Sequence, residues 1–301
     1  LSLVGSEMCI RDSQKAFLRM KSFTNRVLYT QTGGIDLWAT DSPMLSQRGE
    51  GAKHITLIDP DKQSPEIAAK RALVAVECGT SAIFVGGSTD TGSNIVDATC
   101  VAIQEALELA MFASSQHPDA DEDQWNVPVI LFPGGAHAMS SHADGILFMM
   151  LMNSTNRKFL IEEQLQGAPY IAKAGLQTIP TGYIVCAPGG AVGEVGQADL
   201  ISPNDTELIS AYCQTAEMYG FSTVYLEAGS GASTPVSLQL IKTAKSAMNC
   251  TLIVGGGIRT PEQMIAAAKA GADYIVTGTI TEEFEDLQLL KERLKSLISI
   301  L

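Results

Sequence analysis

The sequence predicts a single (β/α)8 barrel of the TIM type, open to a modification in one helix, with an N-terminal extension. From His54 onward, short β-branched and apolar runs alternate with longer segments of helical period, the pattern of parallel strands joined by crossover helices. Eight such units can be counted in a chain of 301 residues, 46% of them hydrophobic, which suffices for one sizeable core. An open doubly wound sheet is the alternative that the same alternation allows.

The expected strands share β-branched and apolar composition, and each is expected to be followed by a helix. They cover residues 54–58, 82–86, 127–132, 145–151, 181–187, 223–227, 251–254 and 273–277. Helix starts are predicted where a capping hydroxyl precedes proline, at Ser64-Pro65, Thr234-Pro235 and Thr260-Pro261. Helix ends are predicted at Gly79, Gly175, Gly220 and Gly271.

The chain divides into three parts. Residues 1–13 lack the basic start and long apolar core of a secretory signal and resemble translated sequencing-adapter read-through, so they are set aside as a non-native leader. Residues 14–50 are a mixed, polar N-terminal extension without an assigned role. The barrel is expected over 51–301, and its polar, acidic stretch at 114–126 is interpreted as a solvated surface insertion.

Charge and cysteine content exclude several classes of protein. A formal net charge of -13 argues against a nucleic-acid partner, because phosphate backbones demand clustered Lys and Arg. An anionic substrate must therefore be held by backbone N–H groups, a metal or a few local cations. The 6 cysteines form no C-x-x-C pair, which favours reduced thiols in a cytoplasmic protein. No apolar run approaches a membrane span, so membrane contact is expected to be peripheral at most.

The first two strand ends indicate a metal site. In a β/α barrel the chemistry lies at the carboxyl ends of the strands. Asp59 and Asp61 flank a proline after the first strand, where a carboxylate can ligate Mg²⁺ shared with a substrate's phosphates. Capping of the turn is the structural alternative for both. After the second strand, two glycines precede Ser88, whose hydroxyl can join a metal shell or contact a phosphate.

The last three strand ends indicate a phosphate cradle. The sixth strand ends at Glu227 and continues into a small-residue loop rich in N–H donors. The seventh ends in Gly255-Gly256-Gly257 and the eighth in Gly278-Thr279, and such loops after strands seven and eight frequently bind phosphate in barrels. Two anionic groups are therefore expected: a small phosphate on this side and a metal-bound diphosphate beside Asp59.

Two further patterns have plain structural readings. His137 and His142 lack a third ligand nearby, so a surface loop or a substrate contact is favoured over a metal site. The run 148–152, Phe-Met-Met-Leu-Met, fits either an apolar binding wall or a buried strand, and the buried strand is favoured.

The strand-end motifs resemble those of the geranylgeranylglyceryl phosphate synthase family. They are LIDPD at 57–61, GGST at 86–89, YLEAGSG at 225–231, GGGIR at 255–259 and TGT at 277–279. ILFPG at 130–134 and GYIVCAPGG at 182–190 are similar to its archaeal-type subgroup, and the resemblance runs from about His54 to the C-terminus.

The resemblance implies a Mg²⁺-dependent prenyltransferase that joins geranylgeranyl diphosphate to the C3 hydroxyl of sn-glycerol-1-phosphate, the first committed step of archaeal ether phospholipid biosynthesis. It implies Mg²⁺ at Asp59 and Ser88, with Asp59 and Glu227 as the catalytic carboxylates. The implied glycerol-1-phosphate contacts are Tyr225, Leu226, Glu227, Ala228, Gly229, Ser230, Gly231, Gly256, Gly257, Gly278 and Thr279. A homo-oligomer, dimer or hexamer, is also implied.

The resemblance places Phe159 beside the prenyl channel. Relatives carry Trp there, so the smaller ring leaves the accepted chain length open. A heptaprenylglyceryl phosphate synthase is thus one alternative. A phosphate-binding barrel isomerase or lyase is another, since GGGIR and TGT suit it equally, although it gives no reason for LIDPD with YLEAGSG. A non-catalytic phosphometabolite-binding barrel would tolerate loss of Asp59 and Glu227.

Overall fold

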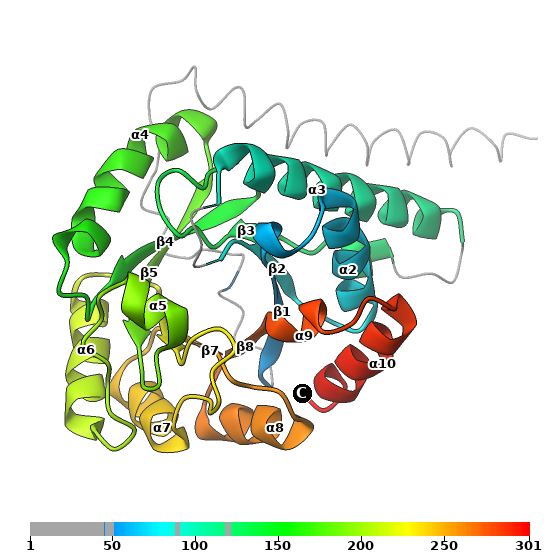
Figure 1. Ribbon diagram of the computed structural model, residues 1–301. Coiled ribbons are helices and arrows are strands. Elements are labelled where there is room, and N and C mark those ends of the chain that lie inside the picture. Colours follow the sequence, from blue (N-terminus) through cyan, green and yellow to red (C-terminus); the bar gives the residue numbers. More distant parts are fainter. Residues whose placement is uncertain (1–44, 46–50, 88–90, 118–121) are drawn as a thin grey trace, which may run out of the picture.

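A computed structural model describes residues 45, 51–87, 91–117 and 122–301. The leader at 1–13 and nearly all of the extension at 14–50 lie outside these residues. Eight parallel strands form one closed barrel in chain order, and helices surround them as an outer ring (Figure 1). The predicted (β/α)8 barrel is therefore confirmed.

The strands lie close to their expected positions. They are β1 (Lys53–Ile58), β2 (Ala82–Val85), β3 (Val129–Leu131), β4 (Gly145–Leu151), β5 (Gln177–Val185), β6 (Thr223–Glu227), β7 (Thr251–Gly255) and β8 (Tyr274–Thr277). Pairing of β1 with β8, from Lys53 opposite Tyr274 to Thr56 opposite Thr277, closes the barrel. The largest difference is β5, which begins at Gln177 rather than 181 because the residues before the expected start also pair with β4.

The described helices and helical turns are α2 (Pro65–Glu77), α3 (Ser93–Ser115), α4 (Glu163–Ala174), α5 (Gly190–Val195), α6 (Thr206–Met218), α7 (Leu238–Ala247), α8 (Pro261–Ala270), α9 (Thr279–Glu282), α10 (Leu287–Ile298), and the short turns η1 (Pro60–Lys62), η2 (Glu122–Trp125) and η3 (Lys158–Glu162). The predicted caps Ser64 and Thr260 begin α2 and α8, each accepting a backbone N–H. The start at Thr234-Pro235 is wrong, because α7 begins after Ser237. Thr234 instead lies in the loop before α7, and its carbonyl packs against Gly257.

The expectation of a helix after every strand is wrong for β3. The connection from β3 to β4 contains no helix, since residues 132–144 are too few and include Pro133, Gly134 and Gly135. The sequence allowed for a barrel modified in one helix, and the modification is the helix missing from this connection. The β3–β4 connection therefore supplies no helix to cover the outer face of β4, and loop residues and α4 cover it instead.

Two apolar layers hold the fold together. The larger layer lies between the strands and the helices. The second fills the barrel interior with side chains such as Ile55, Phe84 and Ile253, and Leu45 belongs to it although it precedes the barrel in sequence. Leu45 is only 3% exposed, and its carbonyl accepts a hydrogen bond from the Thr251 hydroxyl. Leu45 of the extension therefore contributes to the core.

The remaining structural expectations are confirmed in part. Among the cysteines that the structure describes, all are free and all but Cys78 are buried. Most of the described residues in the stretch 114–126 are exposed, as expected, although the Trp125 indole donates to the Ser114 hydroxyl and its ring packs on the outer layer. Within the described part of the chain, no helix is long and apolar enough to cross a membrane.

Candidate active site

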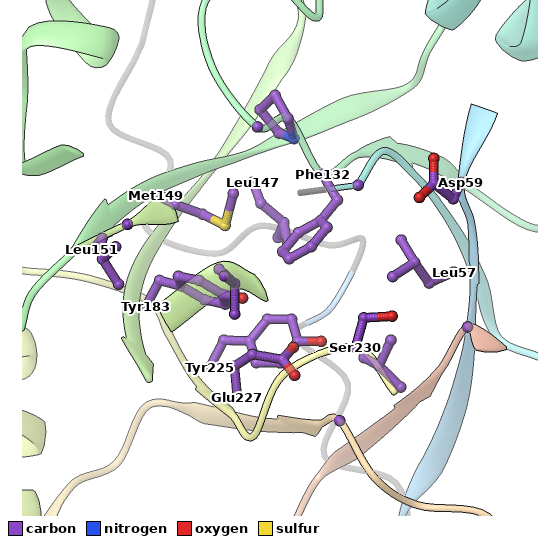
Figure 2. A pocket seen from close by; sticks show the side chains of 18 of the residues that line it. Leu57, Asp59, Phe132, Leu147, Met149, Leu151, Tyr183, Tyr225, Glu227 and Ser230 are labelled. Atoms are coloured by element: carbon purple, nitrogen blue, oxygen red, sulfur yellow. The ribbon is translucent and has the colours of Figure 1, made fainter. Parts of the chain in front are cut away.

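One pocket opens at the carboxyl ends of the strands and collects the residues singled out by the sequence. Figure 2 shows Asp59, Glu227 and Ser230 facing a common opening, with Met149 and Leu151 on the side away from Asp59. We call its chemistry-bearing side the polar half, formed by Asp59, Tyr225, Glu227, Ser230, Gly231, Gly256, Gly257, Gly278, Thr279 and Glu282. We call the other side the apolar arm, formed by Met139, Ile146, Leu147, Phe148, Met149, Leu151, Phe159, Gly167, Ile171, Val192 and Val195.

Strand β6 supplies the polar half by alternation. Successive side chains of a strand point to opposite faces, so Tyr225 and Glu227 enter the pocket while Leu226 packs in the outer apolar layer. Ala228 is likewise buried in that layer. The side chains of Leu226 and Ala228 therefore point away from the pocket, and the expected substrate contacts of these two residues would come from their main-chain groups.

Glu227 is a buried carboxylate with several donors. It is 6% exposed, and its Oε1 accepts the Gly229 N–H at 2.6 Å. Tyr183 and Tyr225 donate their hydroxyls to the same carboxylate. Burial raises the pKa of Glu227 above its ordinary value, while the Gly229 N–H and the two tyrosine hydroxyls oppose that rise. A carboxylate in this setting can hold a polar substrate group and accept a proton from it.

Tyr183 was missed by the sequence reasoning. It lies on β5, where it reads as one more apolar core residue within GYIVCAPGG. In the structure its ring makes an edge contact with Tyr225 at 5.2 Å between centroids, and Phe132 packs 5.8 Å from Tyr183 and 5.6 Å from Tyr225. The three rings form an aromatic wall beside Glu227. The pairing of β5 with β6 sets Tyr183 opposite Tyr225, and Phe132, which follows β3, packs against both.

The loops after β6, β7 and β8 form the expected cradle. Gly256 and Gly257 adopt φ of 82° and 71°, which favours glycine, and a Cβ on Gly256 would collide with Glu227 Oε1. Gly257, Gly278 and Thr279 line the same pocket, and Gly278 immediately precedes the first turn of α9. Arg259 also lines it, with its guanidinium bonded to the Gly231 carbonyl at 3.2 Å. N–H groups and one cation thus converge where a phosphate can bind.

The metal side is described except for Ser88, which lies outside the described residues. Asp59 accepts the Asp61 N–H at 3.0 Å, and burial raises the pKa of its carboxyl. A Cβ on Gly87 would lie 2.6 Å from Asp59 Oδ2, so only glycine leaves that carboxylate its space. Glu282, a second carboxylate missed by the sequence reasoning, lines the same opening; burial and the Asp59 charge raise its pKa.

These residues fit a hard divalent cation. Two desolvated carboxylates in one opening supply the oxygen donors that Mg²⁺ prefers, and they leave room for phosphate oxygens of a ligand. No group of three or more His, Cys, Asp and Glu that could hold a metal occurs among the residues that the structure describes. A cation here would therefore share its coordination with a bound phosphate. His142 contacts Asp97 at 2.9 Å, away from this opening.

The apolar arm corrects the reading of residues 148–152 as plain core. Phe148, Met149 and Leu151 line the pocket, together with residues from both faces of β4. Phe159 reaches it from η3, a π-helical turn that precedes α4. Such turns occur frequently at functional sites. The arm extends to Met139 and Ile171, into the region where β3 lacks its helix. Its chemistry suits a long hydrocarbon chain.

Known proteins are similar to this chain in sequence and in fold. A geranylgeranylglyceryl phosphate synthase from Thermofilum pendens is 44% identical over 241 residues, covering 80% of this chain and 87% of the relative. The enzyme of the same name from Methanococcoides burtonii is 44% identical over 250 residues, covering 83% and 94%.

Solved structures agree. Wild-type GGGPS from Thermoplasma volcanium matches with a TM-score of 0.73 and 41% identity over 83% of this chain and 92% of its own. (S)-3-O-geranylgeranylglyceryl phosphate synthase from Thermoplasma acidophilum, in complex with substrate sn-glycerol-1-phosphate, matches with a TM-score of 0.74 and 36% identity over 83% and 93%. The model of the PcrB family matches residues 47–296. The chain belongs to the PcrB family.

Proposed function

We propose that the chain is a geranylgeranylglyceryl phosphate synthase, which transfers a geranylgeranyl group from its diphosphate to the C3 hydroxyl of sn-glycerol-1-phosphate and releases diphosphate. The observation that carries the proposal is one pocket with a polar half and an apolar arm that meet at Glu227 and the aromatic wall. The synthases named above, which match over most of their own length, support it.

In this proposal the polar half binds the acceptor. The phosphate lies against the N–H groups around Gly257 and Gly278 and beside Arg259, which offset locally the chain's net charge of -13. Glu227 then orients the glycerol hydroxyls, since its carboxylate is fixed by the Gly229 N–H and two tyrosines. The Thermoplasma acidophilum protein, solved with sn-glycerol-1-phosphate, supports this choice of acceptor.

The donor occupies the other part of the pocket. Its hydrocarbon chain lies in the apolar arm, which excludes water from the reacting carbon, and its diphosphate lies beside Asp59. Asp59 would hold Mg²⁺ together with Glu282, which lines the same pocket, and with Ser88, which follows β2 in the sequence. When bound, Mg²⁺ supplies charge stabilisation of the departing diphosphate.

The chain's own residues complete the transfer. Loss of diphosphate leaves an allylic cation at C1 of the donor, and the faces of Phe132, Tyr183 and Tyr225 lie where they can stabilise it. The C3 oxygen of the acceptor then bonds to C1 of this cation, and the electron pair of the broken C1–O bond leaves with diphosphate. Glu227 accepts the hydroxyl proton, which its raised pKa favours.

Self-association into a dimer or hexamer is part of the proposal. Met218 and Tyr219, adjacent at the end of α6, are 83% and 64% exposed, which suits burial against another copy. Sedimentation velocity decides this point, and a purely monomeric species at micromolar concentration would contradict it.

The experiment that tests the activity is incubation with sn-glycerol-1-phosphate, geranylgeranyl diphosphate and Mg²⁺, followed by product mass analysis. The sn-3 enantiomer serves as the matched control. We expect ether product from the sn-1 substrate only, and equal turnover of both enantiomers would count against the assignment. Parallel reactions with C15 and C35 donors separate a geranylgeranyl enzyme from a heptaprenyl enzyme.

A further inference from the structure

Arg71 is a buried cation on the side of the pocket that carries Asp59. It lies on α2, and only 6% of it is exposed. Its Nη1 donates to Gln63 Oε1 at 2.7 Å and its Nη2 donates to the Phe284 carbonyl at 3.1 Å. The guanidinium therefore joins the loop that follows β1 to the segment that follows β8, the two strands that close the barrel.

A further bond extends this connection to the proposed metal side. Gln63 Nε2 donates to the Asp59 carbonyl at 3.0 Å. Hydrogen bonds thus run from the Phe284 carbonyl through Arg71 and Gln63 to the main chain of Asp59. At the other end, Phe284 follows α9, whose first residue, Thr279, lines the phosphate cradle. The relay spans the two loops that must hold the two anionic groups of the substrates.

Stability alone gives little reason for this arrangement. Burying a guanidinium costs desolvation, and here its two hydrogen bonds go to neutral acceptors, while the carboxylate that its charge acts on is Glu282 of the pocket. Its Nε has no hydrogen-bond partner among the described residues. An apolar side chain of similar size would pack α2 without that orphan donor. Departures of this kind from good packing are concentrated where a residue serves a site.

We propose that Arg71 is a positioning residue that fixes the Asp59 loop relative to the cradle loop and thereby sets the affinity of the pocket for Mg²⁺-bound diphosphate. The inference rests on the proposed function for the identity of that ligand. Small displacements of a ligating group lower affinity and rate steeply, so a relay of directed hydrogen bonds is an effective restraint.

The test measures binding of inorganic pyrophosphate in the presence of Mg²⁺ by titration calorimetry, with thermal unfolding recorded for each protein. The variants are Arg71→Met, Gln63→Leu, the double variant and Arg71→Lys. Lys245→Met is the matched control, because Lys245 bonds both oxygens of Asp273 at 2.6 Å just before β8, away from the pocket. Gln63 is only half-buried, so its variant keeps the test available if Arg71→Met does not fold.

We expect Arg71→Met and Gln63→Leu each to weaken Mg²⁺-dependent pyrophosphate binding by about tenfold. The double variant should be no weaker than Arg71→Met, since both act through one relay. Arg71→Lys should be intermediate, because it keeps the charge but not the two-pronged geometry. Lys245→Met should bind as the wild type does, even with a lowered melting temperature.

Unchanged binding in a folded Arg71→Met or Gln63→Leu protein would overturn the inference, as would effects that add in the double variant or an equal loss in Lys245→Met. A wild type without any Mg²⁺-dependent pyrophosphate binding would overturn it too. A wild type that binds this ligand but transfers no prenyl group would refute the proposed function alone, and the variants would still decide the role of Arg71.

Discussion

The polar half and the apolar arm of the pocket are built in different ways. Residues of the polar half stand at strand ends and in glycine-rich loops, where Glu227 is a buried carboxylate and Gly257 has a positive φ and no space for a Cβ. The arm consists of residues such as Phe148 and Ile171 that would serve equally in a plain core. The reaction therefore depends on particular residue types, whereas the accepted substrate length depends on the space that packing leaves.

Removing the carboxylate of Asp59 should have the largest effect. Asp59→Ala is expected to lower kcat/KM by at least about 10³-fold, because the departing diphosphate loses its metal-supported stabilisation. Asp61→Ala is the control: alanine keeps the backbone N–H that contacts Asp59 and removes a neighbouring charge that raises the pKa of Asp59. Steady-state kinetics with a circular dichroism check of folding measure both, and near-normal transfer by Asp59→Ala would remove this residue from the metal site.

Glu227→Gln should follow, with a loss of about 10² to 10⁴-fold in kcat, as expected for a positioned proton acceptor. The wild-type rate should fall as pH drops through the raised pKa of Glu227, so the acid limb lies above the ordinary value of 4.5. The limb should be absent in the variant. Single-turnover rates across pH measure this, and a change in KM alone would reduce Glu227 to a binding residue.

Filling the apolar arm should change donor length rather than chemistry. A Cβ on Gly167 would lie 2.7 Å from Met139 Cε, so Gly167→Val should force this side chain into the arm. We expect the preference for C20 over C10 donors to fall about tenfold, with little change for the short donor. Phe159→Trp should instead lower the use of a C35 donor, because the larger ring takes space at the arm. Leu165→Val, on the exposed face of α4, is the control, and equal losses for both donors would contradict this role of the arm.

The smallest effect concerns the scaffold that both parts share. Burial lowers the pKa of His54 to about 3, while its ring bonds Thr80 and Thr277 at 3.0 and 2.9 Å. The unfolded state therefore binds the extra proton, and His54 makes stability fall as pH drops below about 6.5. At pH 5.5 the loss should be about 1.4 kcal/mol. Urea unfolding at pH 7.5 and 5.5 measures it, and His54→Gln should remove that part of the pH dependence.

What could be predicted from the sequence also differs between the polar half and the apolar arm. The alternation of strands with helical segments, and the helix starts where Ser or Thr precedes proline, predicted the barrel, because each is a local signal. Asp59 and Glu227 were found since polar residues at strand ends stand out against apolar surroundings. Tyr183 and Glu282 were missed, because Tyr183 gains its role from the pairing of β5 with β6 and Glu282 from the position of α9 after β8, which pairs with β1. The arm was predicted at Phe159, but the buried strand was favoured for residues 148–152. No local pattern distinguishes a buried strand from a pocket wall.

The most direct test of the central claim follows the acceptor oxygen. sn-Glycerol-1-phosphate labelled with ¹⁸O at the C3 hydroxyl is incubated with geranylgeranyl diphosphate and Mg²⁺. The masses of the ether product and of the released diphosphate are then measured by mass spectrometry. If the acceptor in the polar half attacks a donor held in the arm, the ether retains the label and the released diphosphate carries none. Unlabelled ether, labelled diphosphate or the absence of ether would contradict this account of the pocket.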